Sequence, residues 1–157
     1  MTLVEQLALG VAGSLFGALL GGALSWGRAM HERRLSLTLA LYSEFHAPAF
    51  NHIRILAHRA LESAPDMPAA YARSLGEEKD AVSSLVHFWE KVAVLKQSGA
   101  LERRLLARLF GQYARWWREL LCRGAGAQDD EWGQTLKDID RALAQIIRQD
   151  TRKGARK

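Results

Sequence analysis

The sequence predicts an all-α protein in which one N-terminal transmembrane helix continues into a small cytoplasmic antiparallel helical bundle. Three observations predict this fold: a long initial stretch without charge, apolar residues at helical spacing in the remainder, and short connections between the helical segments. A chain of 157 residues accommodates one domain, or one small domain with an appendage. We therefore expect an anchor over residues 1–27, a bundle over 28–150 and a basic tail over 151–157.

The uncharged stretch runs from Gln6 to Gly27. Within it, Leu7 to Trp26 gives 20 positions, and a helix of that length spans about 30 Å, the thickness of the hydrocarbon core of a bilayer. A cleavable signal peptide would instead carry its positive charge before a shorter apolar run. Here the basic residues follow the run, so the positive-inside rule places the N-terminus outside and the bundle in the cytoplasm: Arg28, His31, Arg33 and Arg34.

Small residues recur at every fourth position of this anchor. One row is a tandem G-x-x-x-G of Gly13, Gly17 and Gly21, and a second row lies beside it: Gly10, Ser14, Ala18 and Gly22. Such rows let two helix backbones approach closely within lipid, where no hydrophobic force drives association. They predict a homo-oligomer held together by the anchor, and the rival interpretation is a monomeric helix in which Gly and Ala are merely common.

The first part of the bundle is predicted as helix from Arg28 to about Glu62, with a break near His46–Ala47 because Pro48 follows. Residues Leu35–Leu41 alternate with period two, which indicates a strand. We favour helix there because the apolar helix leads straight into this segment and no turn residues bracket it. The prolines of Ser63–Ala69 predict a loop.

Further helical segments follow in order. A helix beginning near Pro68 and broken around Gly76 leads into one over Asp80–Ser98, which Gly99 ends. The next helix covers Leu101–Cys122, and the last is capped by Asp129 or Asp130. Residues of these helices that recur at helical spacing are expected to form the core: Leu85, Phe88, Trp89, Val92, Leu95, Leu106, Leu109, Phe110, Tyr113, Trp117, Leu120, Trp132, Leu136, Ile139, Leu143, Ile146 and Ile147.

The run Val86–Leu95, with Gly99–Glu102, Leu109-Phe110-Gly111 and Trp116/Trp117 after it, resembles an uncharacterised bacterial family of short membrane-anchored helical proteins. Members of this domain of unknown function have a transmembrane helix, a long helix and a pattern close to L-N-x-F-E, then G-x-(I/L)-D and F-G. The resemblance covers roughly residues 82–120, and His87 and Glu102 stand where the family has Asn and Asp. It implies an architecture in the bacterial inner membrane and no established activity.

His87 and Glu90 stand at i and i+3, a spacing used by metal ligands in di-iron bundles. Such a site needs further carboxylates, and only Glu44 and Glu102 are candidates, so we expect neither a metal nor another cofactor. A structural role is favoured instead, with Glu90 in a buried or half-buried pair with Arg104 or Arg54. The single cysteine, Cys122, follows a helix beside Arg123, where a thiol pKa can fall, but we expect a packed, spare thiol.

Four arginines of the predicted 101–122 helix fall at i, +4, +11 and +14 and so share one face: Arg104, Arg108, Arg115 and Arg118. This arginine stripe, with Trp116 nearby, fits an ordinary solvated face, a contact with anionic lipid head groups, or a binding surface for an acidic protein partner. Nucleic acid is the least favoured partner, because the chain carries no recognition motif for it.

The sequence lacks the phosphate-binding and nucleophile-elbow motifs of common enzyme classes. We therefore expect a self-associating membrane scaffold, adaptor or regulatory protein and not an enzyme. The alternative is a membrane-perturbing, pore-forming effector of a bacterial toxin or phage-defence system, gated by its cytoplasmic bundle.

Overall fold

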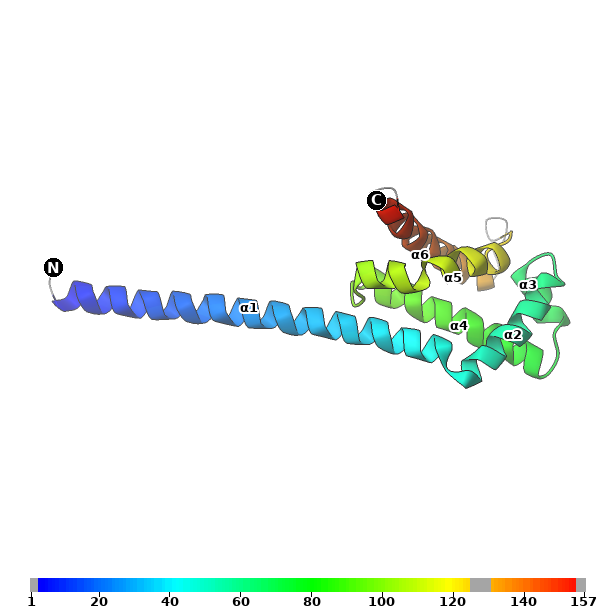
Figure 1. The fold of residues 1–157 in the computed structure, drawn as a ribbon, viewed down its shortest axis with the longest axis horizontal. Helices are drawn as coiled ribbons and strands as arrows, with labels where there is room; N and C mark the ends of the chain where they lie inside the picture. The colour runs from blue at the N-terminus through cyan, green and yellow to red at the C-terminus, as the bar shows by residue number, and fades with distance from the viewer. Residues whose placement is uncertain (1–2, 125–130, 155–157) are drawn as a thin grey trace. The chain divides into compact units, whose positions relative to one another are not determined.

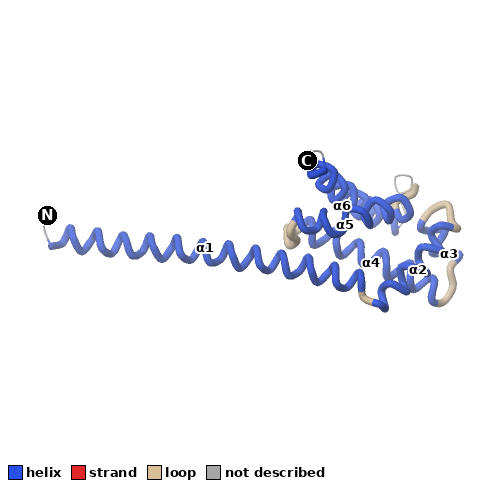
Figure 2. The backbone as a smooth tube through the Cα atoms, viewed as in Figure 1, coloured by secondary structure: helices blue, strands red, loops and turns tan. Residues whose placement is uncertain are grey.

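The computed structural model describes the backbone of residues 3–124 and 131–154, and the side chains of residues 21–124 and 132–151. Six helices and no strand occur in these ranges (Figures 1 and 2), which confirms the predicted all-α class. The helices are α1 (Leu3–His46), α2 (Pro48–Glu62), α3 (Met67–Arg73), α4 (Glu77–Gln97), α5 (Arg103–Leu121) and α6 (Glu131–Gly154).

The chain divides into two units, residues 1–34 and residues 35–157. The first unit holds the N-terminal part of α1, and the second holds the rest of α1 with the five other helices. Across the described part of the chain, no helix is both long enough and apolar enough to cross a membrane. Most of the anchor that the sequence predicts falls on residues 1–20, whose side chains lie outside the described residues.

The break between α1 and α2 lies where the sequence predicts it. Ala47 is extended, with φ −60° and ψ 142°, and Pro48 is the first residue of α2. Proline disfavours a helical conformation in the residue before it, and its own fixed φ suits the first turn of a new helix. Residues Leu35–Leu41, whose alternation resembles a strand, lie within α1.

The helix predicted to begin near Pro68 is α3, which begins at Met67, where the Asp66 carboxylate accepts a hydrogen bond from the Ala69 N–H at 2.8 Å and caps the first turn. Two other predicted boundaries need correction. Helix α4 begins at Glu77 and not at Asp80. Helix α6 continues to Gly154, into the predicted tail, whereas the predicted caps Asp129 and Asp130 lie outside the described residues.

The turn between α4 and α5 fixes the register of both helices against α1. Gly99 has φ +70°, a conformation that favours glycine, and it lets the Ala100 N–H donate to the Leu95 carbonyl at 3.0 Å. Glu102 then caps α5 through its side chain, which accepts from the Leu105 N–H. The Glu102 N–H itself donates to the hydroxyl of Thr38 at 3.0 Å, and Thr38 is fully buried in the unit formed by residues 35–157.

The core of this unit is built around Phe45, which is fully buried. Aromatic rings from three other helices have centroids 5.0 to 5.8 Å from it: Phe50, Phe88, Trp89, Phe110 and Tyr113. Helix α2 packs on α4, α4 packs on α6, and α5 lies along α6 (Figure 1). The predicted apolar faces of α4, α5 and α6 are therefore the faces that point into the bundle.

Candidate functional site

The four arginines of the predicted stripe are all exposed on α5, but the structure divides them into two pairs. Arg115 Nη2 donates to Asp150 Oδ2 of α6 at 2.7 Å. Arg118 donates from Nε and Nη2 to the two carboxylate oxygens of Asp140, at 2.7 and 3.3 Å. Among the described residues, Arg104 and Arg108 have no such carboxylate partner, so they carry the uncompensated charge of the stripe.

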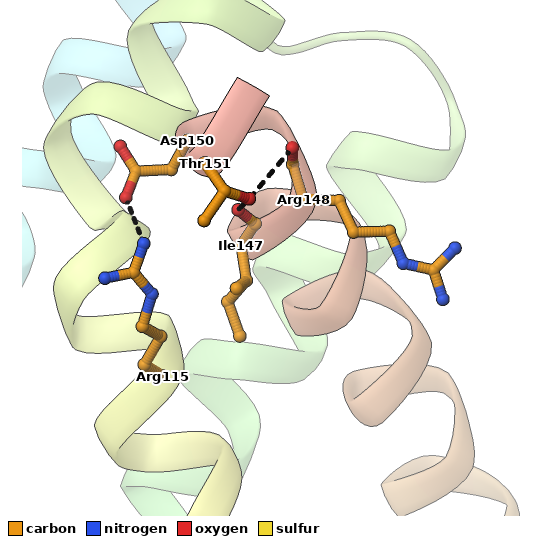
Figure 3. A network of polar contacts seen from close by, with 5 residues as sticks. All are labelled: Arg115, Ile147, Arg148, Asp150 and Thr151. Atoms are coloured by element: carbon orange, nitrogen blue, oxygen red, sulfur yellow. Dashed lines mark hydrogen bonds and ion pairs between the residues drawn. The ribbon is translucent and has the colours of Figure 1, made fainter. Parts of the chain in front are cut away.

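Helices α5 and α6 approach closely at Gly111, which is buried. A Cβ added there would lie 2.7 Å from the Cγ and Oδ2 atoms of Asp150 and 2.9 Å from its Cβ. Glycine therefore makes room for Asp150, whose carboxylate then reaches Arg115 one helical turn further along α5 (Figure 3). Sequence reasoning included Gly111 only within the family resemblance and missed this packing role.

An open groove of about 640 Å³ lies between α5 and α6 near the C-terminal end of α5. Its α5 side is Arg118 and Cys122, and its α6 side presents residues at helical spacing along one face: Lys137, Asp140, Arg141, Ala144, Gln145 and Arg148. Ala144 lies between the longer lining residues of α6, and its short side chain protrudes less into the groove than theirs do. Four of the eight lining residues are cationic and one is anionic.

A further cation lies next to the groove, beside its lining residue Gln145. Lys96 of α4 donates a hydrogen bond to the Gln145 side-chain oxygen. Burial lowers the pKa of Lys96, and the positive charge of Arg103 at the start of α5 lowers it further. Cations from three helices thus gather on this side of the bundle. The sequence signal for the α6 part, basic residues at i, +4 and +11 from Lys137, was present but was not recognised.

Cys122 does not have the lowered thiol pKa that a neighbouring arginine can cause. Burial raises the pKa of the Cys122 thiol to about 12, and the Asp140 carboxylate adds to this effect. Arg123 points elsewhere, because its Nη1 donates to the Ala64 carbonyl oxygen at 3.1 Å. This burial agrees with the packed thiol that the sequence predicts, and the groove contains a neutral thiol.

His87 and Glu90 contact each other on the surface of α4. The His87 Nδ1 and Glu90 Oε2 atoms are 3.8 Å apart, and the two side chains are 65% and 47% exposed. The ion pairs of the described residues give Glu90 the partner His87 and neither of the arginines proposed from the sequence. Arg54 donates to Asn51 at 2.7 Å and lies over the Phe45 ring at 4.4 Å.

The other carboxylates considered for a metal site are used differently. Glu44 of α1 accepts two hydrogen bonds from Lys91 of α4, at 2.5 and 2.7 Å, and Glu102 caps α5. The residues described by the structure contain no group of three or more His, Cys, Asp or Glu that is placed to hold a metal ion. His46 instead lies at the α1–α2 break, with its Nε2 atom 3.0 Å from the Tyr113 hydroxyl.

Trp116 forms the aromatic edge of the stripe. It is 47% exposed and stacks on the buried Trp117 with ring centroids 5.4 Å apart. Its ring centroid also lies 5.0 Å from that of His58 of α2, in a T-shaped arrangement. The exposed indole faces away from the core and lies on the same helix as the stripe arginines.

Of the small-residue rows in the predicted anchor, only Gly21 and Gly22 fall among the residues whose side-chain surroundings are described. A Cβ added at either position would have no atom within 4 Å. Five residues of the two rows lie outside that range: Gly10, Gly13, Ser14, Gly17 and Ala18. Leu24 and Trp26 are 69% and 71% exposed, so the described end of the apolar segment is uncovered within this chain.

Comparisons of the chain with models of protein families, with curated proteins and with solved structures give no match. The resemblance to a family of short membrane-anchored helical proteins therefore stays a prediction.

Proposed function

We propose that the protein is a single-pass membrane-anchored helical scaffold, adaptor or regulatory protein that self-associates through its N-terminal segment. The observation that carries this proposal is the uncharged run from Gln6 to Gly27, followed directly by basic residues. The exposed Leu24 and Trp26 support it, because apolar side chains without cover in the chain are suited to lipid or to a second copy.

The structure of the bundle also supports this proposal. Its core is filled by side chains of residues 35–157, and three helix-to-helix ion pairs join its surface: Glu44–Lys91, Arg115–Asp150 and Arg118–Asp140. A module with its own core needs only a tether to be held at a membrane. No Gly or Pro occurs between Arg28 and Arg34, so the sequence joins the two parts without a flexible linker.

The exposed end of the arginine stripe fits this placement. Arg104 and Arg108 carry uncompensated charge, and near an anionic membrane surface each basic residue contributes about 1 kcal/mol of attraction. We propose that they contact anionic head groups or an acidic protein partner at the cytoplasmic face. This role is separate from that of Arg115 and Arg118, which pair with α6.

Extraction of membranes with alkaline carbonate tests the anchor. The wild-type chain is expected to stay with the membrane, and Leu15→Arg with Leu19→Arg is expected to release it, because an arginine at the centre of a span costs about 2.5–3.5 kcal/mol. Leu39→Arg with Val94→Arg adds the same charge at positions that are 52% and 59% exposed in the bundle, and should not release the protein. Extraction of the wild-type chain would contradict the anchor.

The orientation is tested in spheroplasts with a membrane-impermeant maleimide. In a Cys122→Ser background, Thr2→Cys should be labelled from outside. Gln112→Cys, at an exposed position of α5, should be labelled only after lysis. The reverse pattern would place the bundle outside the cytoplasm.

A further inference from the structure

Four basic side chains gather at one end of the bundle, around the turn that joins α4 to α5. We call this set the basic end, and it consists of Lys96 in the last turn of α4 with Arg103, Arg104 and Arg108 of α5. The three arginines are exposed, and the Lys96 amine donates a hydrogen bond to the neutral side chain of Gln145. Within the described part of the chain, none of the four forms an ion pair with a carboxylate.

The fold does not require cations at these positions. Arg103 and Arg104 are the first two residues of α5, where the helix dipole disfavours positive charge. Arg104 and Arg108 are four residues apart on the same helix, a spacing at which like charges repel each other. Burial lowers the pKa of Lys96, and the positive charge of Arg103 lowers it further, so these two cations are also neighbours in space. An anionic surface against the basic end would relieve each of these repulsions.

The carboxylates next to the basic end have other partners. Glu102, in the turn itself, accepts a hydrogen bond from the backbone of α5 and caps that helix. The start of α5 is therefore capped by the chain, and it is the side chains of the basic end that are left to meet a partner. Asp150 of α6 approaches α5 at Gly111, and its carboxylate is bound to Arg115 (Figure 3).

The basic end lies where the chain enters the bundle. The Glu102 N–H donates to the hydroxyl of Thr38 at 3.0 Å, and Thr38 lies in α1 three residues after Leu35, the first residue of this unit. In the sequence, residues 28–34 alone separate the unit from the predicted anchor, and seven residues in any conformation span at most about 25 Å. An anchored chain therefore keeps these cations at a high local concentration near the bilayer, where weak attractions suffice for contact.

We propose that the basic end binds the anionic lipid head groups of the membrane in which the chain is anchored. This inference rests on the proposed anchor, and it assigns the exposed part of the arginine stripe to lipid. A set of four basic side chains beside a membrane anchor has the size of the clusters that recognise anionic lipids. A protein partner would need aromatic or apolar anchor residues beside the charges, whereas the turn between the two helices has small or polar residues next to them: Gln97, Ser98, Gly99 and Ala100.

Fluorescence energy transfer from the full chain to labelled head groups in vesicles tests this inference. In a Cys122→Ser background, Gln97→Cys, at an exposed position beside the basic end, is labelled with a membrane-impermeant donor dye after reconstitution, so that only outward-facing bundles report. Transfer should be at least twofold larger in vesicles with about a third phosphatidylglycerol than in phosphatidylcholine vesicles, and high salt should remove the difference. A donor at Leu75→Cys, which is 82% exposed just before the other end of α4, should show a smaller difference.

Two pairs of substitutions separate the basic end from net charge. Arg103→Gln with Arg104→Gln should abolish the difference in transfer between the two lipids and leave the melting temperature unchanged, because both side chains are exposed and form no ion pair. The matched control, Arg59→Gln with Arg73→Gln, removes the same charge from exposed positions of α2 and α3 and should preserve the difference. An equal loss in both pairs would overturn the assignment to the basic end.

Flotation of the same vesicles separates this inference from the proposed anchor. A chain that floats with both lipids but shows equal transfer in both would overturn the lipid contact and leave the anchor in place. A chain that floats only with phosphatidylglycerol, and no longer does so with Arg103→Gln and Arg104→Gln, would contradict the anchor and still support the contact. Equal transfer together with binding of polyglutamate in detergent would assign the basic end to an acidic protein and overturn the inference.

Discussion

Gly111 of α5 and Asp150 of α6 lie so close together that a methyl group on Gly111 would come within 2.7 Å of the Asp150 carboxyl group. Glycine in a helix interior costs about 1 kcal/mol relative to alanine, so the bundle retains this glycine against local propensity. The close approach lets Asp150 reach Arg115 at 2.7 Å. The pair therefore sets how tightly the C-terminal turns of α6 pack against α5.

A double-mutant cycle measures this relationship. Gly111→Ala should destabilise the wild-type chain by about 1–3 kcal/mol, because overpacking outweighs the gain in helix propensity. In an Asp150→Gly background, which removes all three contacting atoms, the same change should stabilise the protein by up to about 1 kcal/mol. Thermal unfolding of the full chain in detergent gives the unfolding free energies of the wild type, the two single variants and the double variant. Equal effects in both backgrounds would show that the two helices are not in contact there.

Phe45 tests whether the C-terminal part of α1 belongs to the bundle. Phe45→Ala should cost about 3–5 kcal/mol of unfolding free energy, since the side chain is fully buried among five aromatic rings. Leu39→Ala on the same helix removes an apolar side chain that is 52% exposed, and should cost less than about 1 kcal/mol. Chemical denaturation monitored by circular dichroism distinguishes the two. Similar small effects would mean that α1 ends outside the core.

The division of the arginine stripe predicts unequal effects of four similar substitutions. Arg115→Ala and Arg118→Ala should each lower the unfolding free energy by about 0.2–1 kcal/mol, and the two-bond geometry places Arg118 at the upper end. Arg104→Ala and Arg108→Ala should leave the melting temperature unchanged. The difference for the paired arginines should shrink in 1 M salt, which screens exposed ion pairs. Four equal values would refute the pairing.

The raised pKa of Cys122 predicts slow alkylation. With a pKa of about 12, the thiolate fraction at pH 8 is about a ten-thousandth, so iodoacetamide should react at least about a hundredfold more slowly than with Gln112→Cys in a Cys122→Ser background. The rate should keep rising up to pH 11, whereas a plateau near pH 8 to 9 would contradict the buried thiol. Asp140→Asn should raise the rate, since that carboxylate helps to hold the thiol protonated.

The same shift has a consequence for stability. The folded-state pKa lies above the ordinary value of 9.0, so the thiol binds its proton more tightly in the folded protein. Its contribution to stability is complete below about pH 9 and is lost as the pH rises towards 12.

Periodicity was sufficient to predict the apolar faces of the bundle. Leu85, Phe110 and Ile139 recur with the helical repeat, and all three are buried. Pro48 and Gly99 act on the local backbone, so the ends of α1 and α4 also followed from the sequence. The start of α3 at Met67 lies within one residue of the predicted start near Pro68, because proline suits the first turn of a helix, and the side-chain hydrogen bond from Ala69 N–H to Asp66 completes the cap.

The candidate site was predicted only in part, because its partners belong to different helices. Spacing along α5 showed that Arg115 and Arg118 share a face, but it contains no information on the carboxylates of α6 that meet them. The role of Gly111 depends on the distance between two helix axes, and the pKa of Cys122 depends on burial by α6. Each of these features arises from packing between residues that are 18 to 39 positions apart in the chain.

The mass of the full chain in density-matched detergent micelles, measured by sedimentation equilibrium, tests the central proposal of a self-associating anchor most directly. The wild-type chain should be oligomeric, and Gly17→Leu with Gly21→Leu should make it monomeric by closing the small-residue face. Ala8→Leu with Ala12→Leu enlarges small residues on the opposite face of the same segment and should leave the oligomer intact. A monomeric wild-type chain, or an oligomer that the glycine substitutions leave unchanged, would contradict self-association through this face.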